Sequence, residues 1–406
     1  MFTIQVPLCI IEIVRRFNVS GAEKKTLLNL PLKVILTEEG ASHFIQNRKK
    51  LLRIKLADNV EEYGISLNNF APLSVQQMIL VDYISKIEIS MPEFASHRQE
   101  VMDLSKLIVF SLLYKQFDRE IFTALVESEC VRKHNRANPS QLIDERTKMS
   151  DSQLRSKMTN MDATIAKARK QILDPLWETI LNNQEFTPEE KNIHLLMTEK
   201  FLNRMSLLNW FVITKFFNKP GFEEILSKIR TVLNNYTEKS KVAEYISVMV
   251  MELALNSENT NMKKEAKIMY RGIDETESLI YDPDIRKKII SEMQRKHELV
   301  FLSWKLGGGS SSIGKQGRLQ ITLYNKDDEF QEVKENIETK KSADLNKQSL
   351  IDFYREMPEG QEGTDLGLYY LSYLDEACKK VNVKFESLVN QYSASELTVI
   401  TLIFNF

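Results

Sequence analysis

The sequence predicts a helix-rich α+β protein, with mixed α/β segments at both ends and a helical region between them. Its 406 residues include only 13 glycines and 10 prolines, fewer than a turn-rich all-β protein uses. Apolar residues make up 43% of the chain and charged residues 27%, which is an ordinary globular composition. Short β-branched runs dominate the two ends, whereas apolar residues three and four apart dominate the middle.

Residues 1–100 are expected to form a small mixed α/β domain that receives an input signal. Their apolar runs are separated by polar turns, and the run after Pro31 has the β-branched composition of a strand. These runs are Ile4–Ile13, Leu32–Leu36, Leu51–Leu56 and Val75–Val81.

Residues 101–217 are predicted to form a helical connector. Residues 103–126 carry apolar side chains three and four apart, and a heptad seam follows. The seam consists of Leu154, Met158, Met161, Ile165, Ala168 and Ile172. Such a seam either lines the core of a helical bundle or forms a dimeric coiled coil, so we expect a homodimer through the helices of residues 151–217.

Two local signals mark this connector. The segment 131–170 is basic, with ten Lys and Arg against four Asp and Glu. The Thr-Pro-Glu-Glu run at 187–190 combines a hydroxyl cap, a proline at the first helical position and a glutamate at the third, which predicts a helix start. We expect that helix to continue to about Phe217, where the Asn-Lys-Pro-Gly run at 218–221 ends it.

Residues 218–406 are predicted to contain three helices, two antiparallel strands, another helix and a final strand. The predicted helices are Phe222–Tyr236, Val242–Tyr270, Pro283–Lys296 and Leu366–Val381. The predicted strands are Val300–Leu306, Arg318–Tyr324 and Leu397–Phe404. A Gly- and Ser-rich connection between the first two strands indicates that they are antiparallel.

Charge and cysteine content exclude several classes of protein. The chain carries 55 Lys and Arg against 56 Asp and Glu, so its net charge of −1 gives no bulk attraction to nucleic acid or to an anionic membrane. Its three cysteines are too few and too far apart for a disulfide framework, which favours a reducing compartment. No apolar run is long enough to span a bilayer. We therefore expect a cytoplasmic protein that has no membrane span and does not bind nucleic acid.

Two segments of the C-terminal region carry candidate chemistry. On the predicted helix 242–270, Glu252 and Asn256 stack one turn apart beside an apolar stripe. A carboxylate can act as a general base, and an amide oxygen can bind Mg²⁺ next to a phosphate. The run Gly363–Leu368 opens a helix, where glycines and unpaired N–H groups favour phosphate.

The order of these parts resembles one family. The chain has a helix with Glu252 and Asn256, then a strand ending in an acidic turn, a long polar segment, a glycine-led helix and a Thr-rich strand. This order is similar to that of the ATP-binding domain of the histidine-kinase-like (GHKL) ATPases. The resemblance implies an α/β sandwich in which Mg·ATP lies under a lid of residues 329–362. It implies that Glu252 positions the phosphate acceptor or activates water and that Asn256 binds Mg²⁺. The triphosphate would contact Gly363, Thr364, Gly367 and Leu368.

The chain departs from the family pattern at the nucleotide. Asn325 stands where the family has an aspartate that reads adenine, and no Gly-x-Gly follows it. Asp327 and Asp328 are the alternative substitutes in a shifted register. Asp365 replaces a glycine beside the phosphates. Two hypotheses follow. One is a cytoplasmic signalling protein that binds Mg·ATP to phosphorylate or conformationally regulate a partner protein. The other is a non-catalytic adaptor with a degenerate nucleotide site.

Two further resemblances concern the earlier regions. His134 is followed by a proline five residues on, as in the phosphoacceptor box of histidine kinases, so it is a candidate phosphoacceptor. The alternative is a surface histidine in the basic connector. The basic run Arg48–Arg53 before Asn59 is similar to a PilZ cyclic-di-GMP module, although Glu61 replaces that family's serine. A cyclic-dinucleotide sensor in residues 1–100 is therefore a third hypothesis.

Overall fold

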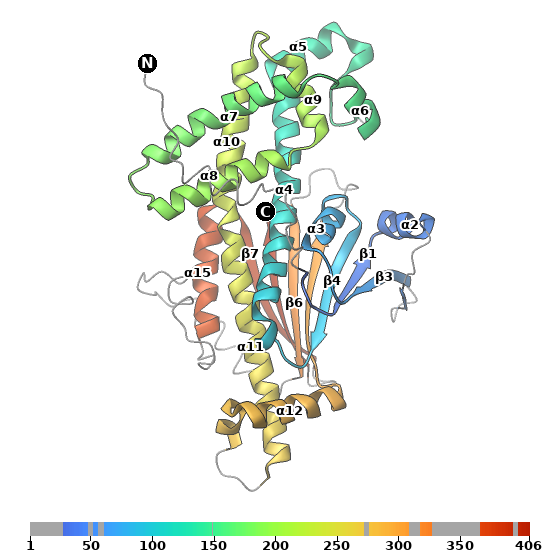
Figure 1. The fold of residues 1–406 in the computed structure, drawn as a ribbon, viewed down its shortest axis with the longest axis vertical. Helices are drawn as coiled ribbons and strands as arrows, with labels where there is room; N and C mark the ends of the chain where they lie inside the picture. Colours follow the sequence, from blue (N-terminus) through green and yellow to red (C-terminus); the bar gives the residue numbers. More distant parts are fainter. Residues whose placement is uncertain are drawn as a thin grey trace. The chain divides into compact units, whose positions relative to one another are not determined.

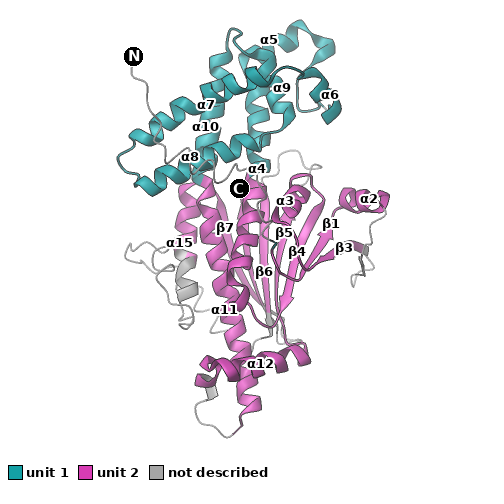
Figure 2. Ribbon diagram, in the orientation of Figure 1, with its two compact units in different colours: residues 1–27, 114–238 teal, residues 28–113, 239–406 magenta. Residues whose placement is uncertain are grey.

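The computed structural model, shown as a ribbon in Figure 1, describes most of the chain. The described residues are 27–47, 52–55, 61–147, 149–271, 276–307, 317–326, 366–392 and 397–406. They form two compact units, coloured separately in Figure 2. Unit 1 contains residues 114–238, and unit 2 contains residues 28–113 and 239–406. Helices α4 (Arg98–Val126) and α10 (Phe222–Ser240) each contain a boundary between the units.

Unit 2 is built on one antiparallel sheet with strand order β2-β3-β1-β4-β5-β6-β8-β7. The strands are β1 (Leu32–Leu36), β2 (Leu52–Lys55), β3 (Glu61–Leu67), β4 (Ile84–Met91), β5 (Val300–Gly307), β6 (Arg318–Lys326), β7 (Lys384–Tyr392) and β8 (Leu397–Asn405). Strand β4 pairs with β5, with Ile87 opposite Trp304. Both side chains are fully buried, so the core crosses the junction between the N-terminal and C-terminal strands.

Helix α11 (Val242–Met269) is the central helix of unit 2. It packs against β5 and β6, and it also contacts η3 (Thr276–Tyr281), α12 (Pro283–Lys296) and α15 (Leu366–Lys380). Figure 1 shows α11 and α15 side by side. Every residue from 246 to 254 is buried, which is expected for a helix enclosed by other elements on several sides.

Two short helices accompany the N-terminal strands. Helix α2 (Glu38–Gln46) begins after Thr37, whose Oγ1 accepts a hydrogen bond from Gly40 N at 3.1 Å. Gly40 lies so close to the carbonyl of Tyr83 that a Cβ at this position would clash with it. Helix α3 (Pro72–Leu80) begins with a proline, whose fixed φ suits the first helical position. The short helix η1 (Ala95–His97) precedes α4.

Unit 1 is helical throughout its described part. Its elements besides the segments of α4 and α10 are α5 (Glu129–Ala137), η2 (Pro139–Gln141), α6 (Asp151–Lys157), α7 (Asp162–Asn182), α8 (Pro188–Asn203) and α9 (Leu207–Phe216). Aromatic rings fill its core. The ring of Phe201 lies 5.2 Å from that of Phe117 and 5.9 Å from that of Tyr236, centroid to centroid.

The predicted fold class is confirmed, because the chain is a helix-rich α+β protein. The predicted helix start at Thr187 is also confirmed. Its Oγ1 accepts from Glu190 N at 3.2 Å, and the Glu190 carboxylate accepts from Thr187 N at 2.7 Å. Among the described helices, none combines the length and the apolar character needed to cross a bilayer.

The prediction of one helix from residue 188 to Phe217 is wrong, because the chain breaks between α8 and α9. Ser206 caps the second helix by accepting a hydrogen bond from Asn209 N at 3.4 Å. The partly buried carboxylate of Asp118, on α4, accepts from Ser206 N at 2.7 Å. A tertiary contact therefore fixes the break, and the local sequence alone did not reveal it.

The predicted heptad seam does not lie on one helix. Helices α6 and α7 are separated at Asn160, whose φ of 66° is incompatible with a continuous right-handed helix. Leu154, Ala168 and Ile172 are buried within unit 1. The seam therefore lines the core of a bundle instead of forming one coiled coil over residues 154–172. A homodimer through residues 151–217 stays a prediction.

The contacts divide the chain differently from the expected segments 1–100, 101–217 and 218–406. Strands from the first and last of these segments share one sheet, because β4 pairs with β5 from Met91 opposite Val300 to Lys86 opposite Lys305. Periodicity identifies a strand but does not reveal its partner.

Candidate functional site

Some of the residues expected at a nucleotide site lie in the described part of the chain, and the others lie outside it. Glu252 and Asn256 lie on α11, and Gly367 and Leu368 lie in the first turn of α15, which packs against α11. Asn325 lies on β6, paired with Thr398 of β8. Asp328, Gly363, Thr364 and the expected lid 329–362 lie outside the described residues. The structure therefore brings the two helices together without describing the phosphate-binding loop.

Glu252 lies inside unit 2, with 5% of its surface exposed. The guanidinium of Arg98, at the start of α4, lies 3.6 Å from its carboxylate. An opposite charge at this distance favours the ionised carboxylate and offsets part of its desolvation. A general base must instead approach the proton that it removes. The position of Glu252 therefore matches a structural ion pair better than a catalytic base.

Glu258, two turns further along α11, is fully buried and joins three segments of unit 2. Its carboxylate accepts hydrogen bonds from Phe94 N at 2.5 Å and from Ala95 N at 3.1 Å. It also pairs with Arg286 of α12. Burial raises the pKa of Glu258, and the two N–H donors and the guanidinium act in the opposite direction. The carboxylate therefore satisfies buried backbone groups at the start of η1.

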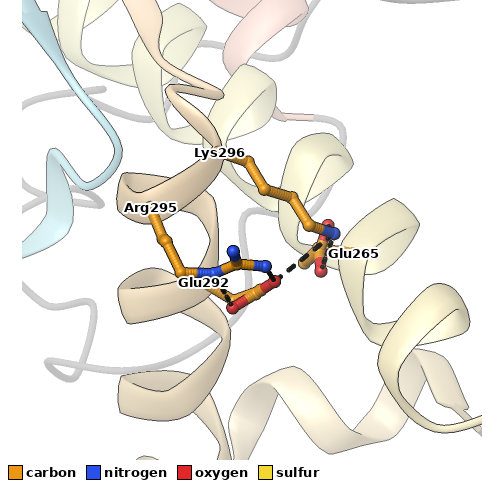
Figure 3. A network of polar contacts seen from close by, with 4 residues as sticks. All are labelled: Glu265, Glu292, Arg295 and Lys296. Atoms are coloured by element: carbon orange, nitrogen blue, oxygen red, sulfur yellow. Dashed lines mark hydrogen bonds and ion pairs between the residues drawn. The ribbon is translucent and has the colours of Figure 1, made fainter.

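Glu265 is the third buried carboxylate of α11. Lys296 Nζ lies 2.7 and 2.8 Å from its two oxygens, and this hydrogen-bonded pairing raises the pKa of Lys296 (Figure 3). Figure 3 also shows Glu292 and Arg295, which pair with each other on α12 at the protein surface. Neither Glu258 nor Glu265 was predicted to be a functional residue. The sequence pattern that could have revealed them is a glutamate that recurs at steps of six and seven residues in a largely apolar helix.

Asn256 retains partial exposure, and its amide oxygen is a suitable Mg²⁺ ligand. Its expected neighbour Glu252 is engaged by Arg98. Within the described part of the chain, no group of three His, Cys, Asp or Glu side chains is arranged to hold a metal ion. Mg²⁺ at Asn256 would therefore need most of its oxygen ligands from phosphate and water, as is usual for Mg²⁺ in nucleotide sites.

His134 lies on α5 in unit 1, in basic surroundings. Its Nε2 lies 3.0 Å from Lys215 Nζ, and its Nδ1 lies 3.1 Å from Asn138 Nδ2. Partial burial and the nearby charges of Lys215 and Lys219 lower the pKa of His134. A phosphoacceptor histidine benefits from a carboxylate that orients its ring and stabilises the charge. Among the described residues, no such carboxylate contacts this ring.

A hollow of about 410 Å³ opens at the surface of unit 2, beside α2 and α3. It is lined by His43, Phe44, Leu73, Ser74, Gln77, Met78, Val81 and Tyr83. The rings of His43 and Tyr83 stack with their centroids 4.7 Å apart. Leu73 is 65% exposed and Val81 42% exposed, so large apolar side chains face solvent there. No sequence signal marked this hollow, because its residues come from separate elements.

Sequence comparisons relate the chain to other proteins. Residues 23–406 match the family described as "Family of unknown function (DUF8084)". A protein of Treponema pallidum (strain Nichols), described as "Uncharacterized protein", is 40% identical over 388 residues, which cover 95% of this chain and 100% of the relative. No solved structure is significantly similar to the chain. The match over nearly the whole length shows that the chain belongs to the DUF8084 family.

Proposed function

We propose that this protein is a non-catalytic adaptor that binds a partner protein through the hollow beside α2 and α3. The observation that carries the proposal is the exposure of large apolar side chains at this hollow, Leu73 above all. Exposed apolar side chains gathered around a concave surface are typical of protein interaction sites. The stacked rings of His43 and Tyr83 add a rigid aromatic surface of the kind that anchors a partner.

The occupant that fits best is the apolar face of an amphipathic helix with a basic flank. The hollow is open and lies beside two short helices, which suits the docking of a helix. Glu39 is exposed one helical turn before His43, so it provides an acidic rim on the same face of α2. A basic residue beside the apolar face of the partner would complement this charge.

The position of Glu252 supports the non-catalytic part of the proposal. Its carboxylate is buried and paired with Arg98, so a reaction at this residue would first have to break a structural contact. The replacement of the adenine-reading aspartate by Asn325 supports the same conclusion. The helix that resembles the nucleotide-binding helix of GHKL proteins thus serves the fold of unit 2.

Site-specific photocrosslinking in cells tests the adaptor. A photoreactive phenylalanine analogue is placed at Leu73, and in a matched control at Leu181, an exposed apolar residue of unit 1 that is 45% exposed. We expect a crosslinked protein from position 73 and none from position 181, and Val81→Asp should abolish it. A synthetic peptide with the sequence of the partner's own amphipathic segment should compete with the partner and reduce the crosslink. Identical adducts from both positions, or adducts that survive Val81→Asp, would contradict the proposal.

Mg·ATP binding is the second candidate, and one observation favours it. Helix α11, with Glu252 and Asn256, packs against α15, which follows the expected phosphate-binding run. Asn256 would hold Mg²⁺ through its amide oxygen. A bound nucleotide at a thousandfold excess over its Kd stabilises a protein by about 4 kcal/mol. Thermal unfolding with millimolar Mg·ATP therefore separates the two candidates.

The adaptor predicts no Mg-dependent stabilisation by ATP and no ATP turnover. A stabilisation that Asn256→Ala abolishes would instead support the nucleotide site on α11. Loss of turnover in Glu252→Gln, with binding retained, would assign that residue the catalytic role implied by the GHKL resemblance and overturn the adaptor proposal.

A further inference from the structure

Three lysines and a histidine of unit 1 form a cluster that we name the basic cluster. Its members are Lys157, Lys215, Lys219 and His134. Nζ of Lys215 lies 3.0 Å from His134 Nε2. Lys157 and Lys219 contact the same two phenylalanine rings as this pair. The cluster brings together the C-terminal ends of α5, α6 and α9.

Two phenylalanines of α9 hold the cations in place. Nζ of Lys157 lies 5.7 Å from the ring centroid of Phe211, and Nζ of Lys215 lies 5.9 Å from the same centroid. Nζ of Lys219 lies 5.3 Å from the ring of Phe216, which also makes an edge contact with His134 at 5.6 Å. Cation–π contacts orient the ammonium groups but leave their positive charge in place.

The basic cluster has no acidic partner within the described residues. None of its three lysines forms an ion pair with a described carboxylate, whereas Lys133 of α5 pairs with Glu129 at 2.7 Å. The cations also oppose one another: the pKa of Lys215 is lowered by partial burial and by the charges of Lys157 and Lys219. The protein therefore keeps these like charges together without pairing them with a described carboxylate.

Helix dipoles compensate this charge only in part. Each cation lies in or just after the last turn of a helix, where the C-terminal end carries about −0.5 of an elementary charge. The three ammonium groups lie at the ends of two helices, α6 and α9, whose dipoles contribute at most about −1. The remaining positive charge of about +2 is comparable in size to the charge of a phosphoryl group, which is about −1.5 to −2 at neutral pH.

We propose that the basic cluster is a binding site for the phosphoryl group of a small phosphorylated ligand. The three ammonium groups would donate to its oxygens, and His134, whose Nε2 accepts a hydrogen bond from Lys215, would orient that ammonium group. Lys157 and Lys215 share the ring of Phe211, and Lys219 and His134 share that of Phe216, which suits a single phosphoryl group better than an extended polyanion. The site is in unit 1 and does not depend on the function proposed for unit 2.

Binding of inorganic phosphate and of phosphoserine to the full-length protein tests the proposal, with acetate as the monoanionic control. Isothermal titration calorimetry should show binding of both phosphoryl compounds and none of acetate. Lys215→Met and Lys219→Met should each weaken binding about tenfold, because each removes one charge beside the anion. Lys133→Met, on the same helix as His134 but already paired, should leave the affinity unchanged.

A structural role of the cluster predicts a different result. Without ligand, Lys215→Met should leave the thermal midpoint unchanged or raise it, because it removes repulsion; a large fall would overturn the proposal. Equal loss of affinity in Lys133→Met would also contradict it, since any surface lysine would then suffice. A phosphoserine peptide that binds far more tightly than phosphoserine identifies a protein-borne phosphoryl group as the source. Tighter binding of an RNA oligonucleotide would contradict the single-phosphoryl site.

Discussion

Charged residues are arranged in opposite ways in the two units. In unit 2, the buried carboxylates of α11 each lie beside a basic side chain, as Glu258 does with Arg286. In unit 1, the basic cluster around Lys215 has no described acidic partner. A buried charge must be compensated within the protein, whereas a half-exposed charge can be compensated by a ligand or by solvent. The comparison separates charges that stabilise the fold from charges available for binding.

The largest expected effect is on the buried pair. Arg286→Met leaves the fully buried Glu258 without its cation, which should lower the free energy of unfolding by about 3–5 kcal/mol. The matched control is Arg295→Met on the same helix. Arg295 is 71% exposed, so the loss of its pairing with Glu292 should change the free energy of unfolding far less. Urea denaturation measures both changes in the free energy of unfolding. Equal losses in the two variants would show that burial does not determine how much an ion pair contributes to stability.

The pH dependence of stability gives a second test of Glu258. Because burial raises its pKa above the ordinary value of 4.5, the folded protein binds this proton more tightly than the unfolded chain. Its contribution to stability is therefore greatest below the unfolded pKa and is lost as the pH rises through the folded pKa. Glu258→Gln should remove this fall, measured as urea midpoints between about pH 4 and pH 7.

Glu292→Gln is a control for which the expected change of stability with pH has the opposite sign. Hydrogen bonds from Arg295 lower the pKa of Glu292, so its contribution is present above the unfolded pKa and is lost as the pH falls. The two variants should therefore change the pH profile in opposite directions. Parallel profiles for the wild type and Glu258→Gln would show that the buried carboxylate does not control this region of the profile.

A smaller effect is expected at the basic cluster, where acidification should tighten anion binding. Lys215, Lys219, Phe216 and Asn138 face His134, and the two lysines help to keep its pKa low. Sulfate is the better probe because the phosphoryl group of phosphoserine itself titrates near pH 6. Sulfate affinity should rise, by up to about tenfold, as the pH is lowered below the ordinary pKa of histidine, about 6.5, and His134 gains a proton. His134→Gln should bind sulfate with nearly constant affinity, and an unchanged rise in that variant would assign the effect elsewhere.

The smallest expected effect concerns a local contact without buried charge. Thr187→Ala removes the side-chain acceptor at the start of α8, which should lower the free energy of unfolding by about 1 kcal/mol. Thr187→Ser keeps the acceptor and should retain most of the stability. Chemical denaturation checks both variants. A loss as large as that of Arg286→Met would remove the distinction between local caps and buried pairs.

Local sequence patterns predicted many elements correctly. The start of α8, the strands β1, β5 and β6, and helix α11 agree with their predicted positions to within a few residues. These elements depend on side chains that are close in sequence, such as Thr187 and Glu190. The break at Ser206 was missed because Asp118, which binds that residue, lies 88 positions away.

The candidate site was harder to predict, because its chemistry depends on partners. Sequence spacing placed Glu252 and Asn256 on one face of a helix, and the structure has both on α11. The pairing of Glu252 with Arg98 could not be read from that spacing. The same holds for the basic cluster: composition marked residues 131–170 as basic, but Lys215 and Lys219 lie outside that segment.

By itself the sequence determined the fold class, several of the helices and strands, and the helix cap at Thr187. These follow from periodicity and capping, which act over a few residues. The tertiary structure alone decided that β4 pairs with β5, that Glu258 accepts hydrogen bonds from Phe94, 164 residues away, and that Lys215 and His134 lie together. Such contacts bring together segments far apart in the chain, and burial then determines whether a charged side chain stabilises the fold or remains available to a ligand.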